Sequence, residues 1–370
     1  MSGWLPVWRR WPRKRVQCMA SGCHAGRTPH RTAVEPTGAA RNHMVRIKLS
    51  LELNYAVAHP GCDFVFNIHA AHTRCQTVVE EKLLLSQAVP SEIHTDPSNG
   101  NRSLRLSAAP GPLKVNYDAT VDLTHHVAVP QQIDEVPVAR LPSHVLPYVY
   151  PSRYCQSDRL GRLAIAEFGH LWKGYSRVQA IRDWVNQRVA FMPNTTNSNT
   201  SAADTLLERV GVCRDFAHLM IALCRAVNIP ARFTTGFDYG ADPALGPPDF
   251  HAYVECYLGD RWYLFDPSGT AIPMGFVRLA TGRDAADVAF ATIFGSVQSP
   301  PPLIQVHAIT DMQHNFELPR HRFEALSTDT GSANEHQPPQ TEAAVAAAPG
   351  LAAVPPAVAT GPVLVKAAPI

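Results

Sequence analysis

The chain lacks the long apolar runs, metal-binding motifs and cysteine patterns that mark several classes of protein. No stretch of its 370 residues approaches eighteen uninterrupted apolar residues, which argues against a membrane-spanning helix. It contains no C-x-x-C pair and no D-x-[DN]-x-[DN]-G loop, so neither structural zinc nor calcium is expected. Eight cysteines in so long a chain do not indicate a disulfide framework. We therefore predict a protein of a reducing, cytoplasmic environment, without metal, organic cofactor or membrane partner.

Charge is distributed unevenly along the chain. Eight of the 33 Lys and Arg residues lie in 1–43 beside a single acid, Glu35, which leaves 25 basic and 30 acidic residues in 44–370. The net charge of that larger part is −5, which predicts no nucleic-acid surface. Residues 1–43 have no apolar run of about 7–15 residues behind their charges, so we expect a disordered basic extension instead of a secretory signal.

Alternating apolar and polar residues indicate β-strands after the basic extension. The period-2 pattern is clear at 45–51 and returns at 64–68, 104–106 and 115–123. Turn-forming Pro and Gly residues separate these runs, and no segment with helical periodicity interrupts them. We predict that residues 44–145 form an N-terminal antiparallel β-sandwich domain.

Helices precede strands in the next part of the chain. The sequence indicates three helices. The first starts near Ser176, the second is capped by Thr200 or Ser201 and stopped by Gly211, and the third, longer helix ends before Pro230. Strands are predicted at 231–238, 251–258 and 261–266. This order is typical of an α+β fold and not of a parallel sheet, and it defines a second domain over 146–315. Residues 316–370, rich in Ala and Pro towards their end, are predicted to form a flexible tail.

Cys213 lies at the predicted start of the longer helix, directly after Gly211 and Val212. Unpaired backbone N–H groups and the helix dipole at such a position stabilise a thiolate, and the same donors suit an oxyanion. A lone cysteine near a helix start is more often a packed apolar residue, so the catalytic hypothesis depends on its partners. Cys224 and Cys256 are predicted to pack in the core.

A predicted hairpin brings His251 and Asp266 together. Gly259-Asp260 is a two-residue turn signal, and in its register the numbers of paired residues sum to 519. Asp266 then lies diagonally from His251 on the same face, with roughly 7–8 Å between their backbones. Asp266 can therefore orient the imidazole while His251 exchanges a proton with Cys213. A bulge at the turn would move Asp266 to the opposite face.

Two runs that contain these residues carry a family resemblance. They are GVCRDFAHLMIALCRAVNIPARFTTGF (211–237) and DFHAYVECYLGDRWYLFDPSG (249–269). Together they resemble the transglutaminase-like cysteine-enzyme superfamily, in particular its bacterial two-domain members with an N-terminal β-sandwich. The resemblance implies a papain-like core with Cys213 as nucleophile, His251 as base and Asp266 as orienting residue. The chain departs from the family in having Tyr in place of Trp after His-Ala, and no residue clearly matches the family's upstream oxyanion side chain.

Three functions remain open at this stage. The resemblance implies acyl transfer from amide bonds of peptides or proteins through a thioester, and hydrolysis by a peptidase or amidase is favoured because no calcium-binding loop is present. Transfer to a lysine amine, as in a transglutaminase, is one alternative, and a non-catalytic interaction scaffold on the same fold is the other. Asp238, Tyr239 and Asp249 are candidates for lining a cleft, on proximity in the sequence alone. The sequence gives no indication of oligomeric state.

Overall fold

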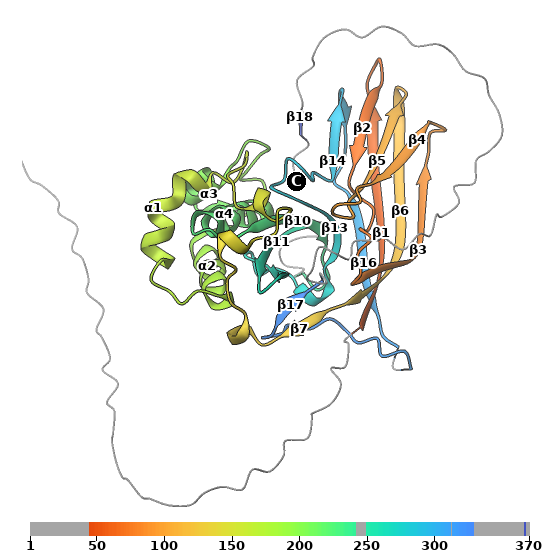
Figure 1. The fold of residues 1–370 in the computed structure, drawn as a ribbon. Helices are drawn as coiled ribbons and strands as arrows, with labels where there is room; N and C mark the ends of the chain where they lie inside the picture. The colour runs from red at the N-terminus through yellow and green to blue at the C-terminus, as the bar shows by residue number, and fades with distance from the viewer. Residues whose placement is uncertain (1–43, 242–248, 312, 329–365, 368–370) are drawn as a thin grey trace, which may run out of the picture. The chain divides into compact units, whose positions relative to one another are not determined.

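Two antiparallel sheets form the first part of the fold, as the alternating apolar residues predict (Figure 1). The computed structural model describes residues 44–241, 249–311, 313–328 and 366–367. The strands in this part are β1 (Met44–Val57), β2 (Cys62–Phe66), β3 (Gln76–Leu85), β4 (Ser91–Thr95), β5 (Arg102–Ala108), β6 (Gly111–Thr124) and β7 (His126–Ala128). Inward residues of β1, β2, β5 and β6 share one core, in which Val45, Ile47 and Leu49 are at most 1% exposed.

Strands from much later in the chain complete both sheets. They are β14 (Ala291–Phe294), β15 (Val297–Gln298), β16 (Leu303–Ile309) and β18 (Lys366–Ala367). β14 pairs with β2, and β15 and β16 pair with β1, all antiparallel. The sequence boundary placed 291–309 in the second domain, whereas these residues belong structurally to the sandwich. Strand pairing across more than 200 residues is a tertiary property that local periodicity does not contain.

The predicted tail begins later than the composition suggests. Ala325–Ser327 forms β17, which pairs with β7 and is at most 5% exposed, so residues before 329 belong to the fold. The remainder of the predicted tail lies outside the described residues apart from β18, and so does the basic extension 1–43.

Four helices form a separate layer (Figure 1). They are α1 (Ser157–Phe168), α2 (Tyr175–Arg188), α3 (Ala202–Glu208) and α4 (Cys213–Ala226), and the connector before them carries the 3-10 turns η1 (Pro130–Gln132), η2 (Val138–Arg140) and η3 (Leu146–Tyr148). The starts of α2 and α3 agree with the sequence prediction. α3 ends at Glu208 and is followed by Arg209 in a left-handed conformation with φ 58°, so it stops before Gly211. Gly211 belongs instead to β9 (Val210–Gly211), which pairs in parallel with β8 (Ala190–Phe191).

A four-stranded antiparallel sheet lies between the helices and the sandwich. Its order is β12 (Arg261–Phe265), β11 (Phe250–Leu258), β10 (Ala231–Phe237) and β13 (Val277–Gly282), and η5 (Pro273–Gly275) precedes β13. One face packs on α4 through residues such as Val254, and the other joins the sandwich core through residues such as Tyr253. Every residue of β10 and β11 is therefore buried, and this includes polar ones such as Arg232 and Glu255, which form a buried ion pair.

The sandwich and this sheet are joined by backbone hydrogen bonds as well as by apolar packing. The Ala71 N–H donates to the Arg278 carbonyl at 2.9 Å, and the Gln76 side chain both donates to that carbonyl and accepts from the Arg278 N–H, each at 2.8 Å. Gln76 is 1% exposed. These bonds connect the loop before β3 to the edge strand β13.

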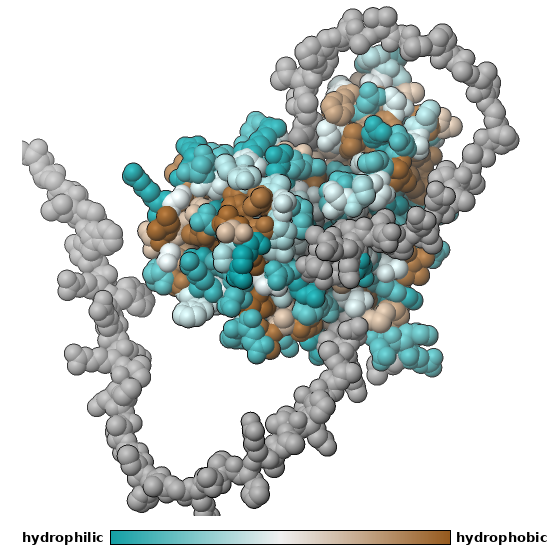
Figure 2. Space-filling model, in the orientation of Figure 1, coloured by the Kyte–Doolittle hydropathy of each residue, from teal (hydrophilic) through white to brown (hydrophobic). Residues whose placement is uncertain are grey.

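The surface of the helical layer is mixed in polarity. Figure 2 shows apolar patches among hydrophilic ones over this layer. Ile165, Trp172 and Leu207 are 63–83% exposed and are among the large apolar side chains that face solvent. None of the helices within the described residues is both long and apolar enough to cross a membrane.

Candidate active site

Cys213 is the first residue of α4, as predicted, and its position is fixed by bonds around the helix start. The Asp215 carboxylate accepts a hydrogen bond from the Val212 N–H at 2.9 Å and another from the Thr196 hydroxyl at 2.7 Å. Asp215 is fully buried, so this cap also ties the loop after β8 to the helix. Cys213 is 7% exposed, and its sulfur lies 3.9 Å from the Phe250 carbonyl oxygen, one residue before the histidine.

Gly211 is required here for space. A Cβ atom at this position would lie 2.7 Å from Cβ of Asp215, closer than real side chains approach. The absence of a side chain at Gly211 thus allows the capping carboxylate to sit directly beneath the residues that precede Cys213.

The hairpin that carries His251 and Asp266 has the predicted register. The pairs run from Leu258–Arg261 to Val254–Phe265, so paired numbers sum to 519 over the whole ladder. Both turn residues, Gly259 and Asp260, have positive φ angles, which matches the twist of a tight two-residue hairpin. The ladder ends at Phe265, and Asp266 directly follows it.

The imidazole of His251 and the carboxylate of Asp266 face one another, as the hairpin predicts. Nε2 of His251 lies 3.4 Å from Oδ1 of Asp266, and the two side chains are 4% and 3% exposed. Asp266 also accepts hydrogen bonds from the Ser268 hydroxyl at 2.6 Å, the Ser268 N–H at 3.0 Å and the Ala271 N–H at 3.3 Å. These donors fix the carboxylate, which in turn fixes one edge of the ring.

The electrostatics of this group favour a charged imidazole. Burial alone lowers the pKa of His251, but the charge of Asp266 at 3.4 Å and the interaction with Cys213 outweigh it and raise that pKa well above its ordinary value. Burial opposes ionisation of Asp266, yet His251, Ser268 and the Ala271 N–H together hold the pKa of Asp266 below its usual range. The structure therefore brings the three predicted residues into one buried cluster of thiol, imidazolium and carboxylate.

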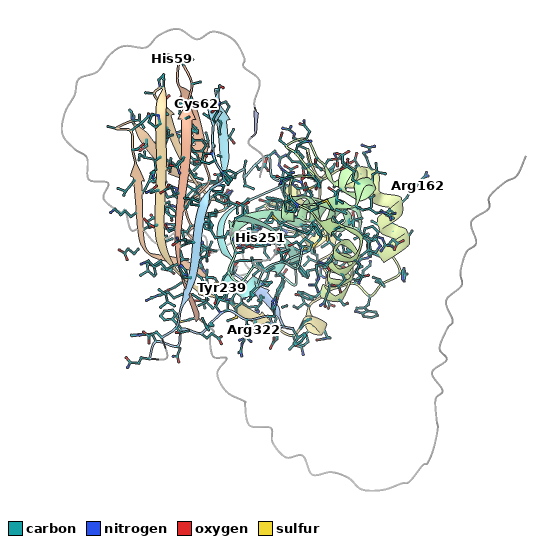
Figure 3. The ribbon with its side chains drawn as sticks, turned by 180° about the vertical axis from the view of Figure 1, so that it is seen from behind. His59, Cys62, Arg162, Tyr239, His251 and Arg322 are labelled. Atoms are coloured by element: carbon teal, nitrogen blue, oxygen red, sulfur yellow. The ribbon has the colours of Figure 1, made fainter. Side chains whose placement is uncertain are left out.

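A second carboxylate, that of Asp238, lies beside the imidazole of His251. Oδ2 of Asp238 lies 3.6 Å from Nδ1 of His251, on the side of the ring opposite Asp266. Burial raises the pKa of Asp238, and it also raises the pKa of Asp249, which lies across the end of the β10–β11 ladder. Figure 3 shows Tyr239 and His251 between the sandwich and the helices. Proximity in the sequence made Asp238 a candidate for lining a cleft, but it did not predict the contact of Asp238 with the ring.

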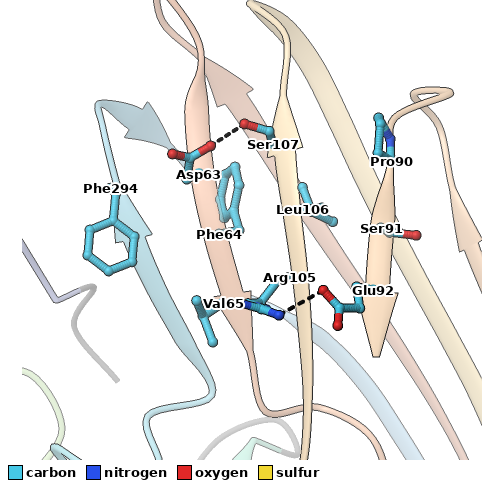
Figure 4. A pocket seen from close by; sticks show the side chains of 10 residues that line it. All are labelled: Asp63, Phe64, Val65, Pro90, Ser91, Glu92, Arg105, Leu106, Ser107 and Phe294. Atoms are coloured by element: carbon cyan, nitrogen blue, oxygen red, sulfur yellow. Dashed lines mark hydrogen bonds and ion pairs between the residues drawn. The ribbon is translucent and has the colours of Figure 1, made fainter. Parts of the chain in front are cut away.

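Among the described residues, the other cysteines lie outside this cluster. The sulfur atoms of Cys224 and Cys256 are 3.9 Å apart in the core, as their pattern predicts. Cys62 lies in the sandwich, away from His251 (Figure 3). A surface pocket on β2, β4, β5 and β14 holds an Arg105–Glu92 ion pair of 2.7 Å, and none of the three predicted residues lines it (Figure 4). The described residues contain no group of three or more His, Cys, Asp or Glu side chains placed to hold a metal ion.

A helix-borne cysteine packed against an antiparallel sheet that carries His and Asp defines a transglutaminase-like core, here preceded by a β-sandwich. Residues 169–267 match the transglutaminase-like superfamily, and residues 45–144 match the bacterial transglutaminase N-terminal domain. A crystal structure from Cytophaga hutchinsonii, described as that of "a putative cysteine protease", is 40% identical with a TM-score of 0.70. The match covers 77% of this chain and 97% of that one. The chain belongs to the transglutaminase-like superfamily.

Curated relatives match over shorter segments. An uncharacterized protein of Mycobacterium leprae is 32% identical over 117 residues, which cover 30% of this chain and 42% of the relative. The uncharacterized protein YebA of Bacillus subtilis is 25% identical over 180 residues, which cover 42% of this chain and 24% of the relative. The chain thus spans less than half the length of these two relatives.

Proposed function

We propose that the protein is a thiol-dependent acyl-transfer enzyme that acts on amide bonds of peptides or proteins. The observation that carries this proposal is the geometry around the buried His251: its Nε2 lies 3.4 Å from the Asp266 carboxylate, and the Cys213 sulfur lies 3.9 Å from the carbonyl of Phe250, the preceding residue. A helix start and a neighbouring imidazole are the surroundings that activate a cysteine as a nucleophile. Superfamily membership supports the same assignment of roles.

The reaction follows from these positions. The Cys213 thiolate adds to the amide carbonyl, and backbone N–H groups at the start of α4 are placed to stabilise the oxyanion. The C–N bond breaks as the His251 imidazolium transfers its proton to the departing amine, which leaves a thioester on Cys213. Neutral His251 then takes a proton from the second nucleophile as that nucleophile attacks the thioester carbonyl. The C–S bond breaks, and Cys213 is released as the thiolate. Asp266 orients the ring through both steps.

Hydrolysis is the favoured second step. The 40% identical protein from Cytophaga hutchinsonii is described as a cysteine protease candidate, and water as nucleophile makes the protein a peptidase or amidase. A lysine amine in place of water would make it a protein-glutamine transglutaminase. Incubation with a Gln-containing peptide and an excess of a primary amine separates the two, because only a transferase accumulates the amine adduct.

Selective alkylation of Cys213 tests the catalytic assignment without a known substrate. Iodoacetamide labelling at pH 6 is followed by mass spectrometry of the tryptic peptide 210–214, and Cys75, which is partly exposed, serves as internal control on peptide 75–82. An ordinary thiol, with a pKa of about 8.5, is almost entirely protonated at pH 6. We expect Cys213 to react faster than Cys75 at pH 6, and His251→Ala to abolish the difference. Equal reactivity in a folded protein would favour the non-catalytic scaffold.

A further inference from the structure

Strand pairing places a carboxylate at the second edge of the His251 ring. Gly236 of β10 pairs with His251 of β11, and the ladder ends one pair later at Phe237–Phe250. Asp238 directly follows β10 and Asp249 directly precedes β11, so the two acids lie on the two strands just beyond the end of the ladder. From there Oδ2 of Asp238 lies 3.6 Å from Nδ1 of His251, while Asp266 lies 3.4 Å from Nε2.

The environment of Asp238 is unfavourable to a carboxylate unless the ring is charged. Asp238 is 8% exposed, and the charged groups that act on it are His251, Asp266 and Asp249. Burial and the charge of Asp266 raise the pKa of Asp238, and His251 opposes both effects. A buried carboxylate beside other acids costs stability, and such residues occur where function requires them.

We propose that Asp238 is a positioning residue that holds the Nδ1 side of His251 and keeps the imidazole protonated in the resting enzyme. This inference rests on the proposed function, because Nδ1 is the atom left to exchange a proton with Cys213 once Nε2 faces Asp266. A carboxylate 3.6 Å from that atom stabilises the imidazolium directly, and it loses this interaction when the proton moves to the leaving amine. Asp238 therefore adds to the stabilisation of the imidazolium by Asp266 and extends the upper pH limit of the thiolate–imidazolium pair.

The test is a titration of the His251 ring by NMR in the full chain, with its resonance assigned by comparison with His251→Gln. Asp238→Asn is compared with Asp249→Asn, a matched control that removes the neighbouring carboxylate, which accepts a hydrogen bond from the Phe250 N–H at 2.7 Å. We expect the midpoint to fall by about one pH unit in Asp238→Asn, and by less in Asp249→Asn. The upper limb of the Cys213 alkylation profile should move by the same amount.

An unchanged midpoint in Asp238→Asn, or an equal shift in both variants, overturns the inference. Asp238→Glu keeps the charge and should restore the midpoint at least in part, which a purely structural role of Asp238 would not produce. A different result would contradict the proposed function: wild-type Cys213 would react no faster than Cys75 at pH 6. The ring titration needs no turnover, so the two failures are distinguishable.

Discussion

Replacing Asp266 with Asn removes the negative charge that faces Nε2 of His251 at 3.4 Å while nearly preserving the shape of the side chain. At an effective dielectric constant of about 20, a unit charge at this distance contributes roughly 5 kcal/mol to the imidazolium, which is an upper limit. Hydrogen bonds to charged groups contribute about 1.5–3 kcal/mol net. The smaller range corresponds to about a ten- to hundredfold loss in the reactivity that depends on the ion pair.

The assay for Asp266→Asn is the second-order rate constant for alkylation of Cys213 between pH 6 and pH 9.5. Because Asp266 raises the pKa of His251, its loss lets the imidazole deprotonate at lower pH and removes the partner of the thiolate. We expect the rate at pH 6 to fall about ten- to hundredfold and the rates at pH 9.5 to converge, since an ordinary thiol is ionised there.

A matched control separates this effect from general destabilisation. Asp284 is also buried, at 2% exposed, and accepts a hydrogen bond from the Tyr154 N–H at 2.9 Å, so Asp284→Asn perturbs a comparable carboxylate. We expect Asp284→Asn to lower the melting temperature without changing the pH profile of Cys213. The electrostatic account is refuted if Asp266→Asn retains the wild-type rate at pH 6, or if both variants lose it equally.

Three further predictions concern the same cluster. Ser268→Ala removes the 2.6 Å hydrogen bond to Asp266 and should lower alkylation at pH 6 by less than Asp266→Asn does, because two backbone donors remain; an equal loss would contradict this. Gly211→Ala forces a Cβ to within 2.7 Å of Asp215 and should destabilise the fold by about 1–3 kcal/mol, measured by urea unfolding, whereas no change would show that the cap yields freely. Asp238→Asn should raise the melting temperature at pH 7. Burial raises the pKa of Asp238 in the folded protein above its pKa in the unfolded chain. The wild-type protein therefore loses stability as the pH rises from the unfolded pKa through the folded pKa, because the buried carboxyl ionises. The gain in melting temperature of Asp238→Asn should vanish below the unfolded pKa of about 3.9.

Local sequence signals were sufficient for the elements that carry the site. Gly259-Asp260 specified a two-residue turn, and side-chain alternation then fixed every pair of the hairpin, which is why Asp266 could be placed beside His251 before any coordinates. The start of α4 was equally local, because Gly211-Val212 and the apolar periodicity after Cys213 define where the helix begins. Such signals succeed because turn geometry and strand period depend on neighbouring residues only.

Contacts between segments distant in the sequence were decided by the tertiary structure. Strand β16 joined the sandwich across more than 200 residues, and α1 formed in a segment where the sequence analysis predicted no helix. The place of Asp238 at Nδ1 likewise depends on the pairing of β10 with β11. The sequence by itself determined the helix start and the hairpin that bear Cys213, His251 and Asp266, because these are local. Which strands complete each sheet, and which carboxylates surround the ring, were decided only by burial of the whole chain, because pairing partners far apart in sequence leave no local signal.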